Sequence, residues 1–287
     1  MKALKAKKPQ AKEKRLKLFM YGDAGVGKTT ACFRLPTPYI IDAERGTENY
    51  TNAINKVGGA VFHTTDIDEV IEEVQKLSTE EHDFKTLVLD PITPLYFDLV
   101  EKMELEHGNE WGKHYGEANK YMKRLINLIM RLDMNVIVTA HAKVVYGDDM
   151  KKAGITFDGW KRLDYIFDLV LELRKQTPTK RYAKVVKTRI ASFPDGETFE
   201  WNYDSLIERY SQEIIEREVE VIKTATDEQC VEIKLLASKL ADGEKFVAKC
   251  LTKAKVTQVT DLTTEQADAM IQHFIKSLGL TTAGATK

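Results

Sequence analysis

A short segment near the start of the chain has the residue types and spacing that can hold a phosphate group. The pattern G-x-x-x-x-G-K-[ST] is matched by Gly22-Asp23-Ala24-Gly25-Val26-Gly27-Lys28-Thr29 and is directly followed by Thr30, which we count with the phosphate-binding residues. Glycines let backbone N–H groups point at a phosphate without obstruction by Cβ atoms. We expect Lys28 to reach the β- and γ-phosphates and the Thr29 hydroxyl to ligate Mg²⁺.

The surroundings of this segment favour a binding site over a glycine-rich turn that binds nothing. An apolar strand pattern precedes it and a helical pattern follows it, which is the context that the motif requires. The N-terminal end of that helix is expected to add a positive dipole. The segment therefore predicts a nucleotide-phosphate site.

Two carboxylates follow apolar runs elsewhere in the chain. Asp90 ends the run Thr86–Asp90, which is typical of an acid that anchors magnesium, although an aspartate there can also simply cap a helix. Glu44 follows the run that ends at Asp42. Because the carboxyl ends of parallel strands face the ligand crevice, Glu44 is placed to polarise a water molecule; the alternative is a solvated loop acid.

These residues need a scaffold, and residues 15–204 indicate a parallel α/β sheet. Short runs rich in Val, Ile and Leu alternate there with longer helical patterns. The clearest helices are Asp66–Leu77 and Glu117–Leu132. The expected strands are Leu16–Tyr21, Pro38–Asp42, Thr86–Asp90, Asn135–Ala140, Leu169–Leu173 and Tyr182–Thr188.

The remainder of the chain has a different character. Residues 205–225 indicate a charged helical connector, and residues 226–287 a small helical domain with a fraying end. Two capping boxes, Thr226-x-x-Gln229 and Thr263-x-x-Gln266, are expected to open helices there. Residues 1–15 form a basic N-terminal arm ahead of the core at 16–204. Such an arm suits a polyanion, but a solvated tail is an equal alternative.

The order of motifs resembles the RecA-type ATPase core over residues 16–204. Ile-Asp-Ala-Glu, Val-Leu-Asp-Pro and Val-Ile-Val-Thr-Ala-His follow the phosphate segment, and a Lys-x-Arg strand comes last. The segment Asn109–Gly116, with Trp-Gly and Tyr-Gly pairs, is similar to one in phage-encoded ATP-binding proteins that serve single-strand annealing and recombination. The resemblance implies a RecA-like P-loop fold with a small C-terminal helical domain.

The resemblance also implies roles for individual residues. It places the catalytic base on Glu44 and puts His141 where RecA-type proteins usually carry a γ-phosphate-sensing Gln, although a histidine could merely end a strand. It implies that Lys187 and Arg189 reach the nucleotide of the next subunit of a ring or filament. The alternative is that these cations only protect an edge strand against pairing with another chain and so against aggregation.

The segment 142–158, expected as a long loop, occupies the place of a DNA-contacting loop in RecA-like cores. Single-stranded DNA needs cations for its phosphates and aromatic faces for its bases. Acidic residues dilute the charge here, and Trp160 could simply pack at the base of the loop. The candidate contacts are Lys143, Tyr146, Lys151, Lys152, Trp160, Lys161 and Arg162.

Composition narrows the class of protein. The net charge is −1, 43% of residues are hydrophobic, and no apolar run is long enough for a membrane span. Three scattered cysteines argue against a disulfide framework and a structural zinc site, and with the absence of a signal-peptide pattern they favour the cytoplasm, that of a bacterial host if the chain is phage-encoded.

We therefore expect a Mg²⁺-dependent ATPase that binds single-stranded DNA, assists annealing or recombination and acts as a homo-oligomer. The C-terminal helices could dock a single-strand-binding or other recombination protein. The alternatives are a nucleotide-gated assembly, helicase-like or packaging module, and a small-molecule P-loop phosphotransferase. The last is disfavoured because the chain shows no arginine-rich lid segment.

Overall fold

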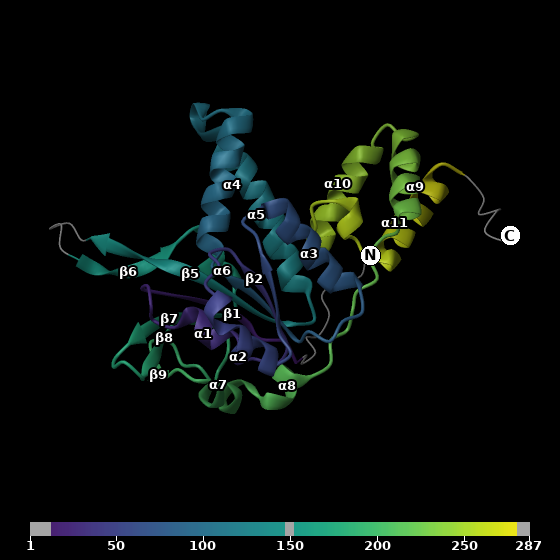
Figure 1. The fold of residues 1–287 in the computed structure, drawn as a ribbon. Coiled ribbons are helices and arrows are strands. Elements are labelled where there is room, and N and C mark those ends of the chain that lie inside the picture. The colour runs from purple at the N-terminus through teal and green to yellow at the C-terminus, as the bar shows by residue number, and fades with distance from the viewer. Residues whose placement is uncertain (1–12, 147–151, 280–287) are drawn as a thin grey trace, which may run out of the picture.

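A nine-stranded sheet forms the centre of the computed structural model, which describes residues 13–146 and 152–279 (Figure 1). Its strand order is β3-β2-β4-β5-β1-β7-β8-β9, and β6 pairs with β5 alone. The strands β1 to β5 and β7 run parallel where they pair, whereas β6, β8 and β9 are antiparallel to their neighbours. The strands are β1 Lys17–Gly22, β2 Pro38–Asp42, β3 Ala60–His63, β4 Thr86–Asp90, β5 Asn135–Tyr146, β6 Lys152–Asp158, β7 Leu169–Lys175, β8 Arg181–Thr188 and β9 Thr198–Glu200.

Helices cover both faces of the sheet, so its central strands are buried on both sides (Figure 1). One face packs against α3 (Ile67–Thr79), α4 (Ile92–His107) and α5 (Lys113–Arg131). The other packs against α1 (Lys28–Cys32), α2 (Thr51–Lys56), α7 (Tyr203–Tyr210) and α8 (Gln212–Glu216). The predicted fold class, a mostly parallel α/β sheet flanked by helices with a C-terminal helical segment, is confirmed. The short helices are α6 Leu163–Ile166, η1 Glu48–Tyr50, η2 Glu110–Gly112 and η3 Val259–Asp261.

The C-terminal helices pack around a hydrophobic cluster of their own. They are α9 (Asp227–Ser238), α10 (Gly243–Ala254) and α11 (Thr264–Ser277). Both predicted capping boxes are present, at the starts of α9 and α11. Asp261, which is buried, joins this bundle to the sheet domain by accepting hydrogen bonds from Arg124 and Gln75.

The largest departure from the sequence-based expectation is at residues 142–158. In place of a loop, β5 continues to Tyr146 and returns as β6, so the two strands form an antiparallel ribbon that extends away from the sheet (Figure 1). The charged connector is helical only at α7 and α8, before an extended segment. No helix among the described residues is long and apolar enough to cross a membrane.

Candidate active site

The phosphate segment has the backbone conformation that its glycines predict. It begins where β1 ends, and Gly25 and Gly27 have φ values of +69° and +93°. A Cβ atom on Gly22 would lie 2.6 Å from the carbonyl oxygen of Leu173 on the neighbouring strand, so only glycine fits there. The loop is therefore held open by residues that have no side chain to fill it.

Lys28 supplies the positive charge of this loop. Its Nζ donates hydrogen bonds to the carbonyl oxygens of Gly22 (2.8 Å) and Asp23 (3.1 Å). Burial lowers the pKa of Lys28, and the negative charges of Asp90 and Glu44 oppose this shift, which shows that both carboxylates lie near the ammonium group. The following helix is only five residues long, because Pro36 and Pro38 follow closely, so the expected dipole adds little.

Asp90 is the last residue of β4, and its negative charge acts on Lys28. Its side chain is buried and accepts hydrogen bonds from the hydroxyl groups of Thr139 and Thr29. Burial raises the pKa of Asp90, and these two hydrogen bonds act in the opposite direction. A hydroxyl group and a carboxylate in contact are hard oxygen donors, which fits Mg²⁺ arriving with the phosphates of a nucleotide.

The side chains of Glu44 and His141 contact each other on the other side of the pocket. The distance between Glu44 Oε1 and His141 Nε2 is 2.8 Å, and both side chains are about half exposed. His141 is brought there by β5, which pairs with β1 so that His141 lies opposite Gly22. The backbone N–H of His141 also donates to the Thr93 hydroxyl, which fixes its position.

The loop that carries Glu44 is held by Asp42, a buried acid at the end of β2. The Asp42 carboxylate accepts hydrogen bonds from the backbone N–H groups of Glu44 (3.0 Å), Gly46 (3.2 Å) and Thr47 (2.9 Å) and from the Thr47 hydroxyl. Burial acts to raise the pKa of Asp42, but these hydrogen bonds outweigh it and lower the pKa. Asp42 is therefore a positioning residue for Glu44.

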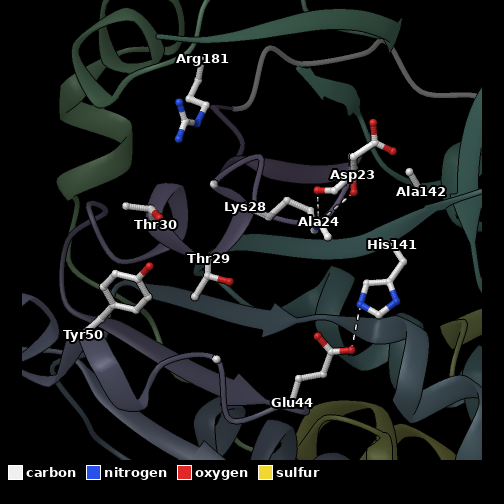
Figure 2. A pocket seen from close by; sticks show the side chains of 14 residues that line it. Asp23, Ala24, Lys28, Thr29, Thr30, Glu44, Tyr50, His141, Ala142 and Arg181 are labelled. Carbon is white, nitrogen blue, oxygen red and sulfur yellow. Dashed lines mark hydrogen bonds and ion pairs between the residues drawn. The ribbon is translucent and has the colours of Figure 1, made fainter. Parts of the chain in front are cut away.

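Lys28, Thr29, Glu44 and His141 line one hollow of about 570 Å³, whereas Asp42 and Asp90 are buried behind its wall. Figure 2 shows the Glu44–His141 pair at one end of it and Arg181 at the other. Arg181 and Tyr50 line the hollow but were missed in the sequence. Only the pairing of β8 antiparallel to β7 brings Arg181 to this edge, and nothing in the sequence marked that pairing direction.

Lys187 and Arg189 lie at the opposite edge of the sheet. Because β8 is antiparallel to β7, its first residue reaches the phosphate segment and its last residues reach the start of β7. The Lys187 ammonium donates to the carbonyl oxygens of Tyr165 and Phe167, and Arg189 pairs with Asp168 at 3.0 Å. Within the chain, therefore, neither cation faces the nucleotide pocket, and the role toward a neighbouring subunit stays a prediction.

The residues predicted to contact DNA fall into different environments. Tyr146, on the ribbon, is 65% exposed, and Lys143 is 3.5 Å from Asp158. The expectation for Trp160 needs correction: its ring is 5% exposed in the core and its Nε1 donates to Asn119, so it is not available to stack on a base. Lys161 and Arg162 are exposed, Lys151 lies outside the described residues, and Lys152 is described by its backbone in β6 alone.

Comparison with known proteins identifies the domain that carries these residues. A family model for an AAA domain, AAA_24, matches residues 14–198, which is more than half of the chain. A search of the curated proteins finds no match. The matched range begins before β1 and ends in β9, so it contains the phosphate segment, Glu44, Asp90 and His141. The chain therefore belongs to the AAA domain family AAA_24 and carries a P-loop ATPase domain of the AAA type.

Proposed function

We propose that the chain hydrolyses ATP in the hollow between the phosphate segment and the Glu44–His141 pair, with Mg²⁺ held by Thr29 and Asp90. One observation carries the proposal. The glycine-rich phosphate segment with Lys28, the buried carboxylate of Asp90 and the half-exposed carboxylate of Glu44 lie together at a single edge of the sheet. The family match to an AAA domain supports the ATPase activity.

The roles of the residues follow from their positions. The loop N–H groups and Lys28 hold the β- and γ-phosphates, and Lys28 exchanges its two carbonyl partners for phosphate oxygens. Glu44 is the acceptor for the proton of the attacking water, and His141 holds the carboxylate in place from the side. Bound Mg²⁺ would neutralise charge that develops on the phosphates.

The experiment measures phosphate release from ATP with Mg²⁺ and with EDTA, for the wild type and for Asp90→Asn. Burial already favours a neutral group at position 90, so the Asp90→Asn variant is expected to fold. We expect turnover that needs Mg²⁺ and falls at least about tenfold in Asp90→Asn. Turnover on a sugar or nucleoside acceptor would support a phosphotransferase, and tight nucleotide-dependent assembly without turnover would support a gated assembly module.

A second proposed function, binding of single-stranded DNA, rests on the β5–β6 ribbon. The ribbon carries exposed apolar and aromatic side chains, Val144, Val145 and Tyr146, next to Lys143. These groups suit unpaired bases and phosphates. The same strand β5 also carries His141, so a ligand on the ribbon would act on the strand that positions the Glu44 pair.

Fluorescence anisotropy with a labelled oligonucleotide tests this second function. Tyr146→Ala should weaken binding about tenfold, since stacking of a base on an aromatic ring contributes roughly 1–3 kcal/mol. The control is Trp111→Ala, a fully exposed aromatic residue in the turn between α4 and α5. Equal losses in both variants, or none in either, would contradict the assignment to the ribbon. Stimulation of ATP turnover by the oligonucleotide in the wild type would link the two functions.

We also propose, on the resemblance to phage annealing and recombination proteins, that the chain acts in that process as a homo-oligomer. The C-terminal bundle, with its own hydrophobic cluster, is the proposed module for a partner such as a single-strand-binding protein. Light scattering with and without ATP and DNA tests the oligomer, and a strand-annealing assay tests the process.

A further inference from the structure

The turn between α4 and α5 holds a tryptophan out into the solvent. Trp111 is fully exposed, and Leu105, in the last turn of α4, is 84% exposed. Figure 1 shows this end of the α4–α5 pair projecting away from the sheet. Trp111 also has a φ of +55°, a left-handed conformation that a non-glycine residue adopts only at a cost in free energy. Exposed apolar side chains on a strained backbone favour a surface that another molecule covers.

A hollow in the C-terminal bundle has walls that suit an aromatic ring. It measures about 350 Å³ and lies between the turn from α9 to α10 and the side of α11. The rings of Phe246 and His273 line it and stack on each other at a centroid distance of 3.9 Å. Phe274 meets Phe246 edge-on, and Leu240 adds an aliphatic wall. An indole ring can pack against aromatic faces and edges of this kind.

The surroundings of the tryptophan and of the hollow carry opposite charge. Residues 104–113, around Trp111, contain three glutamates and one lysine. Residues 239–255, which form α10 and its two ends, contain five lysines and two acids. Asp242, the acid that lines the hollow, is paired with Lys245 at 3.0 Å, and Lys249 and Lys253 are exposed one turn apart on α10. Such complementarity favours association of the two surfaces and fixes their register.

These two surfaces can meet only between two copies of the chain. Trp111 is fully exposed in its own chain, so its own bundle does not hold it. A contact between different surfaces of identical chains is head to tail, because each copy offers its tryptophan to one neighbour and its hollow to another. Repetition of such a contact builds a ring or a filament.

We propose that the chain associates with itself head to tail, with Trp111 of one copy in the hollow between α10 and α11 of the next. The glutamates around Trp111 face the lysines of α10. The contact rests on the proposed homo-oligomer, whose interface it specifies, but it needs neither nucleotide nor DNA. It is a different contact from the one predicted for Lys187 and Arg189.

Sedimentation velocity of the full chain over a series of concentrations, without ligands, tests the contact. The wild type should associate, and Trp111→Ala should weaken association at least about tenfold, because buried tryptophans dominate the affinity of interfaces. Ala241→Phe, which fills the hollow from its rim, should have the same effect. Tyr165→Ala is the control and should associate as the wild type does, because Tyr165 is an exposed aromatic residue near Lys187.

A mixture of the two defective variants tests the head-to-tail geometry. Trp111→Ala keeps the hollow and Ala241→Phe keeps the tryptophan, so the mixture should form one-to-one complexes although neither variant associates alone. Tryptophan emission supplies a second measurement. Trp160 and Trp201 are buried, so a blue shift of the emission on association reports burial of Trp111.

The outcomes separate this interface from the proposed oligomer. Association that is unchanged in both variants, or that is lost only in Tyr165→Ala, would leave an oligomer but overturn this interface. A wild type that is monomeric without ligands would overturn the interface and leave the hollow to the partner protein proposed for the bundle; assembly with ATP and DNA would then decide the homo-oligomer.

A last measurement shows that the effect of Trp111 is on association alone. At concentrations where the wild type is monomeric, Trp111→Ala should equal it in ATP turnover and in oligonucleotide binding. Loss of either would assign Trp111 to ligand binding and overturn its role in the contact between copies.

Discussion

Both edges of the central sheet carry charged side chains, but those at one edge line an open hollow and those at the other are buried or bonded within the protein. At the carboxyl edge, Lys28, Glu44 and His141 line an open hollow, with Glu44 and His141 about half exposed. At the opposite edge, Lys17 is buried at the start of β1, and its ammonium donates to the carbonyl oxygens of Ile129 (3.1 Å), Leu132 (2.9 Å) and Met134 (3.1 Å).

The cationic side chains of this second edge form hydrogen bonds with groups of the protein itself. Arg15 is buried and bonds to Asp133 and to carbonyl oxygens near α8, and Lys187 and Arg189 bond to carbonyl oxygens around α6. A side chain whose hydrogen bonds are all made within the fold stabilises the fold, whereas one that faces a hollow can bind a ligand. Lys28 and Lys187 both donate to backbone carbonyl oxygens, so location beside the hollow, and not residue type, separates function from stability here.

The largest expected effect separates two lysines. Lys28→Ala should lower ATP turnover by about 100-fold or more, because it removes the cation that faces the phosphates. Measured on the isolated chain, Lys187→Ala should keep turnover within about twofold, because its ammonium is bonded to carbonyl oxygens at the other edge. Steady-state phosphate release measures both. A loss of turnover in Lys187→Ala with nucleotide binding intact would break the comparison and support the predicted contact with a neighbouring subunit.

A smaller effect is expected at the support of Glu44. Asp42→Asn should lower kcat about tenfold, because a neutral amide accepts fewer and weaker hydrogen bonds from the loop that carries Glu44. Its ATP affinity should stay near that of the wild type, as measured by calorimetry. If kcat is unchanged, Asp42 does not position Glu44.

At the closed edge, the expected effect is on stability and not on turnover. Lys17→Met should lower the free energy of unfolding by about 2 kcal/mol, because three carbonyl oxygens at the end of α5 lose their donor. Urea denaturation measures the stability, and phosphate release from the folded variant should be within about twofold of the wild type. Loss of turnover in a fully folded Lys17→Met would contradict the division between the edges.

The smallest effect is a pH dependence at Asp133. Burial acts to raise the pKa of Asp133, but hydrogen bonds from Arg15 and the backbone of Glu220 outweigh it, and the pKa is lowered. The unfolded chain then takes up a proton at a higher pH than the folded one, so this stabilisation is present above about pH 4 and is lost as the pH falls.

Asp133→Asn should therefore be less stable than the wild type by about 1 kcal/mol near pH 7. The gap should close on acidification below about pH 4, which thermal unfolding at a series of pH values measures. A stability difference between the variant and the wild type that does not change with pH would show that the charge of the Asp133 carboxylate does not contribute to it.

The sequence was sufficient for the features that depend on local pattern. The phosphate segment was found because its glycines and Lys28 are contiguous, and strands such as Thr86–Asp90 were found because strands buried on both faces are continuously apolar. The convergence of Glu44 and Asp90 near Lys28 was predictable because parallel strands end at one edge.

The remaining features depend on pairings between distant segments. Arg181 and Lys187 belong to one strand, and only the antiparallel pairing of β8 with β7 decides which of them reaches the phosphate segment. The ribbon was expected as a loop because residues 142–158 are long, mixed in character and contain two glycines, and because a loop stands there in the RecA-like cores that the chain resembles. Trp160 was ambiguous because only the packing around Asn119 shows that its ring is buried.

We propose that the open edge hydrolyses ATP and that Glu44 activates the attacking water. ATP binding and phosphate release by Glu44→Gln, measured on the same preparation, test it most directly. We expect ATP affinity near that of the wild type and turnover lower by about 100-fold or more, since the amide cannot accept the proton of the water. Turnover equal to that of the wild type would contradict the claim.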